Sequence, residues 1–290
     1  EKNMVLNFNE FTEKLRKEVE NFISENYDGV AVKDITVAKV NGKKRGFELK
    51  RSFGKGRGES VIFYNDVLYE GYKEAGSFNS FFEKLKKAME KNLSEDKISI
   101  VEKIDRNYIL REVYPMLIST EKNESMLKEN GLLHRETDLG LSIVYCFDVK
   151  INGADGMVRI TSSLAKEYDI TEDELYRVAL ANLSETPPDI LQKSHQNTTI
   201  IEDGKAGAAH LLNDDILQLV ASGYDDNFFI FPISVNTVLA VPAGTNPDIL
   251  AFELKAAVRE INSSEGMPRE MFLSDKLLEY NRGSHRLQLA

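Results

Sequence analysis

The sequence is poor in cysteine and lacks long apolar runs. Cys146 is the only cysteine among 290 residues, so no disulfide can form within the chain. No run approaches the roughly 18 apolar residues that a membrane-spanning helix needs. The first thirty residues lack the basic start and apolar stretch of a secretory signal. These absences predict a cytoplasmic protein with no membrane partner.

Signatures of common catalytic sites are also missing. The run that most resembles a phosphate-binding loop, residues 54–60 (GKGRGES), has the wrong spacing and falls between two expected strands, whereas a phosphate loop opens a helix. None of the four histidines, His134, His195, His210 and His285, lies four residues from another, as zinc ligands on a helix would. There is no G-x-S-x-G nucleophile elbow. The sequence therefore predicts no cofactor and no metal site.

Two chemically interesting side chains have apolar neighbours. Cys146 lies in the run 143–147 (IVYCF), which predicts a buried, unreactive thiol. His210 stands between two alanines and two leucines, which predicts a core histidine, and residues 207–211 are expected to form a short strand.

Composition and charge describe a globular chain with an acidic second part. Hydrophobic residues make up 42% and charged residues 29%, which is ordinary for a protein with a packed core. The net charge is −10, distributed as +2 over residues 1–97 and −12 over residues 98–290. An acidic surface repels nucleic acid, so binding to a polyanion is expected to be weak and confined to the first third.

Hydrophobic periodicity organises the chain into two parts. Residues 9–27 predict an amphipathic helix, and three strands follow, the first two joined at Asn41-Gly42, a dipeptide typical of hairpins. A helix is expected over residues 79–91. In the second part, residues 141–149 predict a strong strand, and Thr171 with Glu174 predicts a capping box, in which each side chain bonds the other's amide.

Strands and helices mix without regular βαβ alternation. This favours an α+β fold with mixed, mainly antiparallel sheets packed by amphipathic helices, over a doubly wound fold. The polar run 92–97 (NLSEDK) follows a well-patterned helix and predicts a linker. We therefore expect two subdomains, residues 1–94 with the basic hairpin sheet and residues 98–290 with the larger acidic fold.

The hairpin region carries the strongest local charge. Eight basic residues fall within residues 39–57 against one acid, Glu48. A solvated sheet edge that discourages aggregation explains such a cluster. A contact with a polyanion or an acidic partner is the alternative, and its candidate residues are Lys43, Lys44, Arg45, Lys50, Arg51, Lys55 and Arg57.

A longer pattern resembles a known family. The matching segments are residues 117–123 (LISTEKN), 138–145 (DLGLSIVY), 170–176 (ITEDELY), 179–182 (ALAN), 207–209 (GAA), 231–234 (FPIS), 238–242 (VLAVP), 258–262 (VREIN) and 273–275 (LSD). The chain is similar in these segments to the bacterial family catalogued as domain of unknown function 5688. The resemblance implies an intracellular bacterial protein and supplies no activity and no functional residues.

Three hypotheses for function remain. The leading one is a non-catalytic protein-interaction module with a protein partner, because catalytic constellations are missing and the two parts differ in charge. The second is an enzyme whose residues converge only in the folded chain, which spacing in the sequence does not test. The third is a weak polyanion binder that uses the basic hairpin.

Overall fold

The computed structural model describes residues 5–52, 58–93, 104–129, 131–151, 154–193, 197–263 and 271–290. The chain divides into two compact units, each described by itself below. Unit 1 is Glu1–Ala38 with Lys43–Ser99, and unit 2 is Lys39–Gly42 with Ile100–Ala290. Helices combine with antiparallel sheets in the described residues, so the predicted α+β fold is confirmed.

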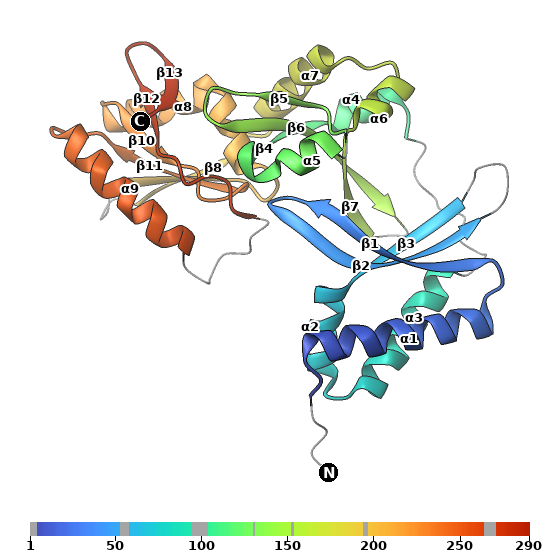
Figure 1. Cartoon of the computed structure of the whole chain (residues 1–290). Coiled ribbons are helices and arrows are strands. Elements are labelled where there is room, and N and C mark those ends of the chain that lie inside the picture. Colours follow the sequence, from blue (N-terminus) through green and yellow to red (C-terminus); the bar gives the residue numbers. More distant parts are fainter. Residues whose placement is uncertain are drawn as a thin grey trace. The chain divides into compact units, whose positions relative to one another are not determined.

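Unit 1 is a three-stranded sheet with helices packed against it. Its elements are α1 (Phe8–Asn26), β1 (Val30–Lys39), β2 (Gly42–Ser52), β3 (Gly58–Tyr64), α2 (Asn65–Ala75) and α3 (Phe78–Leu93). The strands lie in the order β1-β2-β3, and the helices gather on one side of them (Figure 1).

Local signals explain why α1 forms where the periodicity predicts. The Asn7 side chain accepts a hydrogen bond from the Glu10 amide (3.0 Å), and the Glu10 carboxylate accepts one from the Asn7 amide (2.9 Å). This reciprocal cap satisfies amides that the first helical turn leaves free. The apolar stripe of α1 packs on Phe47 and Leu49 of β2, together with a cluster of aromatic rings from α2 and α3. Asn41 at the hairpin turn has φ 60°, a conformation that asparagine tolerates.

Unit 2 begins with a sheet built around one long strand. The elements of this part are α4 (Arg106–Glu112), β4 (Tyr114–Ser119), η1 (Glu121–Asn123), α5 (Glu124–Glu129), β5 (His134–Glu136), β6 (Leu141–Ile151), β7 (Ala154–Arg159), α6 (Ser162–Glu167) and α7 (Glu172–Glu185). The central strand β6 pairs antiparallel with β4, β5 and β7. The pleat points alternate β6 side chains, Tyr145, Phe147 and Val149 among them, into the main core.

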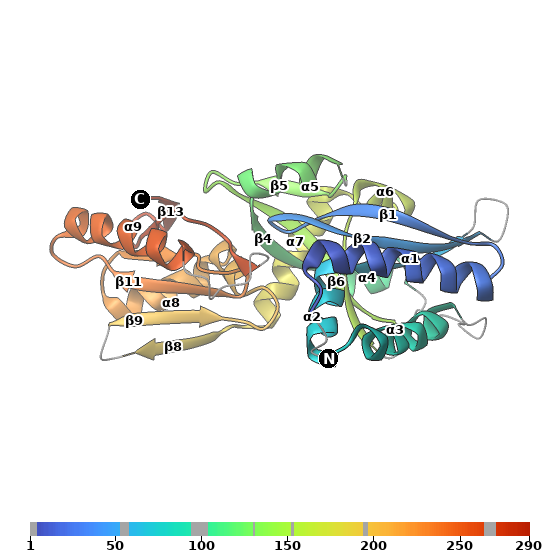
Figure 2. The ribbon, with the colours of Figure 1, turned by 60° about the horizontal axis from the view of Figure 1, so that its bottom comes forward.

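A six-stranded antiparallel sheet completes unit 2. Its elements are β8 (Asp189–Lys193), β9 (Thr198–Glu202), η2 (Gly207–Leu212), α8 (Asp214–Tyr224), β10 (Phe228–Phe231), β11 (Thr237–Pro242), α9 (Pro247–Ser263), β12 (Leu278–Asn281) and β13 (Arg286–Leu289). The strand order is β13-β12-β10-β11-β9-β8. Phe228 and Ile230 face the core that contains α8 residues, while Phe229 and Phe231 face α9, which lies along the sheet in Figure 2.

The structure corrects two local predictions. Residues 207–211 lie in the 3-10 helix η2 and not in a strand, because the segment forms local main-chain bonds such as that from the Ala209 amide to the Ala206 carbonyl (2.8 Å). Gly207 lies so close to the Asn236 carbonyl that a side chain has no room there. The capping box at α7 forms only half. Thr171 accepts a hydrogen bond from the Glu174 amide (3.2 Å), but the Glu174 carboxylate pairs with Arg106 (2.6 Å) and does not reach back.

The domain boundary remains a prediction, since most of the linker expected at residues 92–98 lies in residues 94–103, outside the described part. Limited proteolysis of the full chain, read by mass spectrometry, is expected to cut first within residues 92–98, since an exposed polar linker fits a protease active site. Resistance of this segment, with early cleavage elsewhere, would mean one continuous domain.

Candidate functional site

The central strand β6 extends beyond its partner β4. The β4–β6 ladder runs from Ser119↔Leu141 to Tyr114↔Cys146, where β4 begins after the end of α4. β6 continues to Ile151, and over this last stretch it pairs with β7 alone. Among the residues that the structure describes, no strand therefore pairs with the β4-side edge of β6 after Cys146.

Two main-chain hydrogen bonds show which groups of β6 point to that edge. The Ile160 amide donates to the Tyr145 carbonyl on the β7 side (2.8 Å), and the Thr120 amide donates to the Gly140 carbonyl on the β4 side (3.1 Å). Because hydrogen bonding alternates along an antiparallel strand, odd-numbered residues of β6 face β7 and even-numbered residues face β4. Asp148 and Lys150 therefore turn their amide and carbonyl groups toward the open edge.

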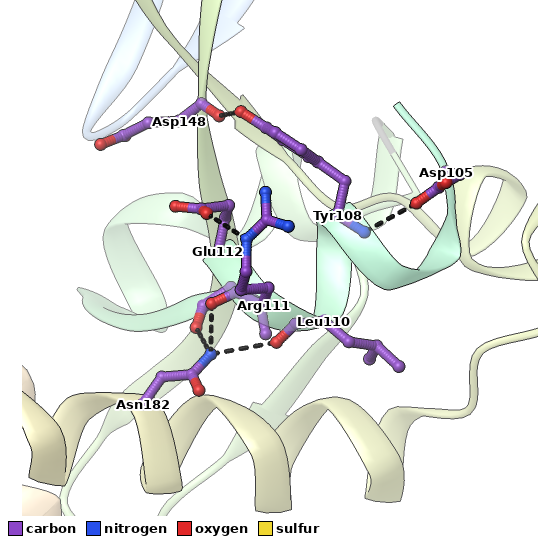
Figure 3. A network of polar contacts seen from close by, with 8 residues as sticks. Asp105, Tyr108, Leu110, Arg111, Glu112, Asp148 and Asn182 are labelled. Atoms are coloured by element: carbon purple, nitrogen blue, oxygen red, sulfur yellow. Dashed lines mark hydrogen bonds and ion pairs between the residues drawn. The ribbon is translucent and has the colours of Figure 1, made fainter. Parts of the chain in front are cut away.

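One of these four edge groups already has a partner. The Tyr108 hydroxyl donates a hydrogen bond to the Asp148 carbonyl oxygen (3.0 Å; Figure 3). The Asp148 amide and both main-chain groups of Lys150 have no strand partner in the described part of the chain. The edge thus presents two donors and one acceptor at strand spacing.

The open edge lies in a cleft formed by two adjoining cavities. The first, of about 690 Å³, is lined by Asp148, Val149 and Lys150 of β6 together with Tyr108 of α4 and Met157 of β7. The second, of about 470 Å³, is lined by the end of α4, the end of α7 and residues 203–206. Both cavities share Arg111, Glu112 and Lys205, so these side chains stand between them.

The Asp148 side chain is held in place by two contacts. The Tyr114 hydroxyl donates to its Oδ1 atom (3.0 Å), and the Lys205 ammonium pairs with its Oδ2 atom. Burial, together with the nearby Asp148 carboxylate, holds the pKa of Tyr114 well above its usual value, so its hydroxyl stays protonated and donates. The hydrogen bond to Asp148 raises the pKa of Lys205, so its ammonium stays protonated.

The short helix α4 forms one wall of the cleft and is clamped by α7. The Asn182 amide nitrogen donates to three carbonyl oxygens, those of Leu110 (3.1 Å), Arg111 (3.2 Å) and Val113 (2.8 Å), as Figure 3 shows. A helix leaves its last carbonyls without intrahelical partners, and Asn182 satisfies them from the side. On the cleft side, Arg111 Nε donates to the Glu112 carboxylate (2.8 Å).

The far side of the second cavity carries Asp203 with a buried histidine behind it. Asp203 Oδ1 accepts a hydrogen bond from the Lys205 amide (2.9 Å), and its Oδ2 lies 3.4 Å from Nε2 of His210. The His210 side chain is fully buried, as the sequence predicts, and its Nδ1 atom has no partner among the described residues. Burial lowers the pKa of His210, so the ring is neutral at pH 7 and carries no charge toward Asp203.

The basic residues predicted from the sequence lie in unit 1. Lys43, Lys44, Arg45, Lys50 and Arg51 are on β2, and Lys44 forms an ion pair with Asp66 (3.2 Å). Lys55 and Arg57 lie outside the described residues. The contact of these side chains with a polyanion or an acidic partner remains a prediction.

The cleft residues were not identified from the sequence. One signal was present: Asp148 and Lys150 alternate with the apolar Phe147 and Val149, which marks a strand whose second face is polar. The distant members carry no such signal, because Lys205 lies 57 residues from Asp148. No group of three or more histidine, cysteine, aspartate or glutamate side chains in the described ranges could hold a metal ion.

Cys146 is expected to be inert in the native protein. It is buried in the β4–β6–β7 sheet, and burial raises the pKa of its thiol to about 12. The reactive thiolate is then negligible at pH 8. A thiol reagent should label the native protein far more slowly than the unfolded protein in guanidinium chloride. Equal rates in the two states would contradict the buried position.

The fold and the cleft together define the class as an α+β protein with an open-edged antiparallel sheet in unit 2. The model of a family described as a family of unknown function (DUF5688) matches residues 8–197 and 198–282, so the chain belongs to this family. No curated protein and no solved structure matches the chain. Among the described helices, none combines the length and the apolar character needed to cross a bilayer.

Proposed function

We propose that unit 2 is a non-catalytic protein-interaction module that binds an extended segment of a partner protein as an added strand on the open edge of β6. The observation that supports it is the pair Asp148 and Lys150, whose main-chain groups face a cleft where none of the described strands lies opposite. Strand addition is a common mode of peptide recognition, in which main-chain hydrogen bonds hold the peptide and side-chain cavities select it.

Hydrogen-bond free energies indicate how much of the binding free energy the strand edge can supply and how much must come from the two cavities. A protein hydrogen bond contributes a net of about 0.5–1.5 kcal/mol. Three edge groups therefore supply only a few kcal/mol, whereas a micromolar complex requires about 8 kcal/mol. The edge alone sets the direction and register of a bound segment, and the remaining affinity must come from side chains that enter the two cavities.

A second copy of the chain fits this edge poorly. The edge lies in a cleft bounded by Tyr108, Arg111 and Lys205, so the same edge of another copy is recessed behind the same walls. A thin extended segment enters such a cleft, while two recessed edges do not reach each other. This favours a partner segment over self-pairing.

The enzyme hypothesis has its best candidate pair in the same cleft, and the geometry does not favour it. A general base must lie within hydrogen-bond reach of the substrate proton. The His210 side chain has no exposed surface, and its Nε2 faces Asp203 at 3.4 Å. The buried ring therefore cannot contact a substrate in the second cavity.

Lys150→Pro is expected to abolish peptide binding and leave the fold intact. The Lys150 amide faces the open edge, so proline removes a donor that the β6–β7 ladder does not use. Peptides would first be selected from a random library displayed on phage against the full chain. Their affinity for the variant, measured by fluorescence anisotropy, should fall at least tenfold, or about 1.4 kcal/mol.

The matched control is Lys150→Ala, which keeps the amide and removes the charged side chain. It should lose affinity only a few-fold. Far-ultraviolet circular dichroism and a thermal melt of both variants would verify that β6 still forms. Unchanged peptide affinity in a folded Lys150→Pro protein would contradict strand addition at this edge.

A further inference from the structure

One acceptor on the open edge of β6, the Asp148 carbonyl, is already occupied by the Tyr108 hydroxyl. The hydroxyl donates to this carbonyl at 3.0 Å, and the Tyr108 side chain reaches it from α4 (Figure 3). An added strand needs the same carbonyl, because an edge-facing carbonyl accepts an amide of the neighbouring strand in both parallel and antiparallel pairing. Tyr108 therefore stands where an amide of the partner segment would donate.

The Tyr108 side chain can leave this position without movement of α4. The helix is fixed at both ends, because Arg106 pairs with Glu174 (2.6 Å) and Asn182 binds the last carbonyls. Tyr108 itself is half-buried and lines the first cavity, of about 690 Å³, into which its ring can turn. Displacement of the hydroxyl thus needs a change of rotamer and no unfolding.

We infer that Tyr108 is a built-in competitor of the partner segment, and that its hydroxyl leaves the Asp148 carbonyl when the segment adds to β6. This rests on the proposed strand addition. In the free protein the contact covers part of an edge that would otherwise attract other exposed strands. Only a segment whose remaining contacts offset the loss of this hydrogen bond opens the edge, so the contact makes recognition more selective.

Tyr108→Phe tests this inference because it removes the hydroxyl and keeps the ring. The ring lies beside Phe147 (centroids 6.3 Å apart) and the Arg111 guanidinium (5.2 Å), contacts that phenylalanine retains. The probes are the peptides selected by phage display on the full chain. Their affinity for the variant, measured by fluorescence anisotropy, should rise about two- to tenfold, the equivalent of one protein hydrogen bond.

The matched control is Tyr168→Phe. The Tyr168 hydroxyl donates to the Ile104 carbonyl (3.2 Å) just before α4 begins, so this variant also removes a hydroxyl that bonds the main chain beside the helix. The edge of β6 is untouched, and peptide affinity should not change. An equal gain in both variants would overturn the inference, because a loosened α4 would then explain it.

Backbone esters in the peptide identify the competing donor. Each peptide N–H is replaced in turn by an ester oxygen, which cannot donate. At the position that faces Asp148, the ester peptide has no amide to displace the hydroxyl, so Tyr108→Phe should no longer raise the affinity. A gain that persists with every ester would overturn the inference, since the hydroxyl and the peptide would not share the carbonyl.

The outcomes separate this inference from the proposed function. Peptides that bind Tyr108→Phe more tightly and lose binding to Lys150→Pro support both. Peptides that lose binding to Lys150→Pro but bind Tyr108→Phe equally or more weakly overturn the competitor role and leave strand addition standing. Failure to select any peptide, or binding that Lys150→Pro does not affect, overturns strand addition and the inference with it.

Discussion

Gly207→Ala is expected to lower the free energy of unfolding of unit 2 by about 3 kcal/mol or more. Overpacking usually costs about 1–3 kcal/mol, and the cost is at the top of this range or above it when the crowding atoms are rigid. A Cβ atom at this position would lie 1.9 Å from the Asn236 carbonyl oxygen and 2.6 Å from its carbon. Both are backbone atoms, which cannot rotate away. Gly207 follows the segment that carries Asp203 and Lys205, so the same change should also loosen the cleft.

The measurement is chemical denaturation of the full chain, with a matched glycine as control. Gly223 lies inside α8, and a Cβ atom there meets nothing within 4 Å. Gly223→Ala should therefore stabilise the protein by roughly 0.5–1 kcal/mol, as glycine-to-alanine changes in helices do. The two alanine variants should shift the midpoint in opposite directions. If Gly207→Ala were as stable as the wild-type protein, the close approach of the Asn236 carbonyl to Gly207 would be refuted.

Asn182→Asp is expected to have the second large effect and to lower the free energy of unfolding by roughly 2–4 kcal/mol at pH 7. The amide nitrogen of Asn182 donates to three carbonyl oxygens at the end of α4. Aspartate replaces this donor with a carboxylate oxygen, which faces the negative end of the helix and leaves partly buried acceptors unsatisfied. The wall of the cleft that carries Arg111 and Glu112 should lose its anchor.

The pH dependence of Asn182→Asp distinguishes charge repulsion from simple loss of a bond. Repulsion by the carbonyls raises the folded-state pKa of the new carboxyl above its unfolded value of about 3.9. The folded variant then binds more protons than the unfolded one, so its stability falls as pH rises through this window. Denaturation at pH 4 and pH 7 should show a smaller deficit at pH 4. Asn182→Ala, expected to lose about 1–2 kcal/mol, should show a deficit that does not change with pH.

Helix α1 and the β1–β2 hairpin were largely predictable because they depend on local patterns. The apolar positions of α1 recur at helical spacing, and Asn41-Gly42 supplies the backbone freedom that a hairpin turn requires. The strand predicted over residues 207–211 was wrong, because glycine and alanine have a low strand propensity and the Ala209 amide bonds the Ala206 carbonyl within the segment (2.8 Å). Elsewhere a tertiary contact overrides a local motif. Glu174 matches the capping motif, yet Arg106, distant in the sequence, takes its carboxylate.

The candidate site could not be predicted from the sequence for a different reason. An open strand edge is defined by where a neighbouring strand ends, and the start of β4 at Tyr114 relative to Cys146 is a register that no local motif specifies. The side chains that line the cleft come from α4, β6, β7, α7 and the segment before η2. The charges of the basic hairpin are adjacent in the sequence, whereas Asp148 and Lys205 meet only through the fold.

Amide hydrogen exchange at β6 tests strand addition most directly. With a selected peptide bound, the amides of Asp148 and Lys150 should exchange markedly more slowly, because the added strand accepts their hydrogen bonds. The amides of Phe147 and Val149 already face β7 and should change much less, which gives an internal control on the same strand. Unchanged exchange at Asp148 and Lys150 in a saturated complex would contradict the account, because the peptide would then bind elsewhere than the open edge of β6.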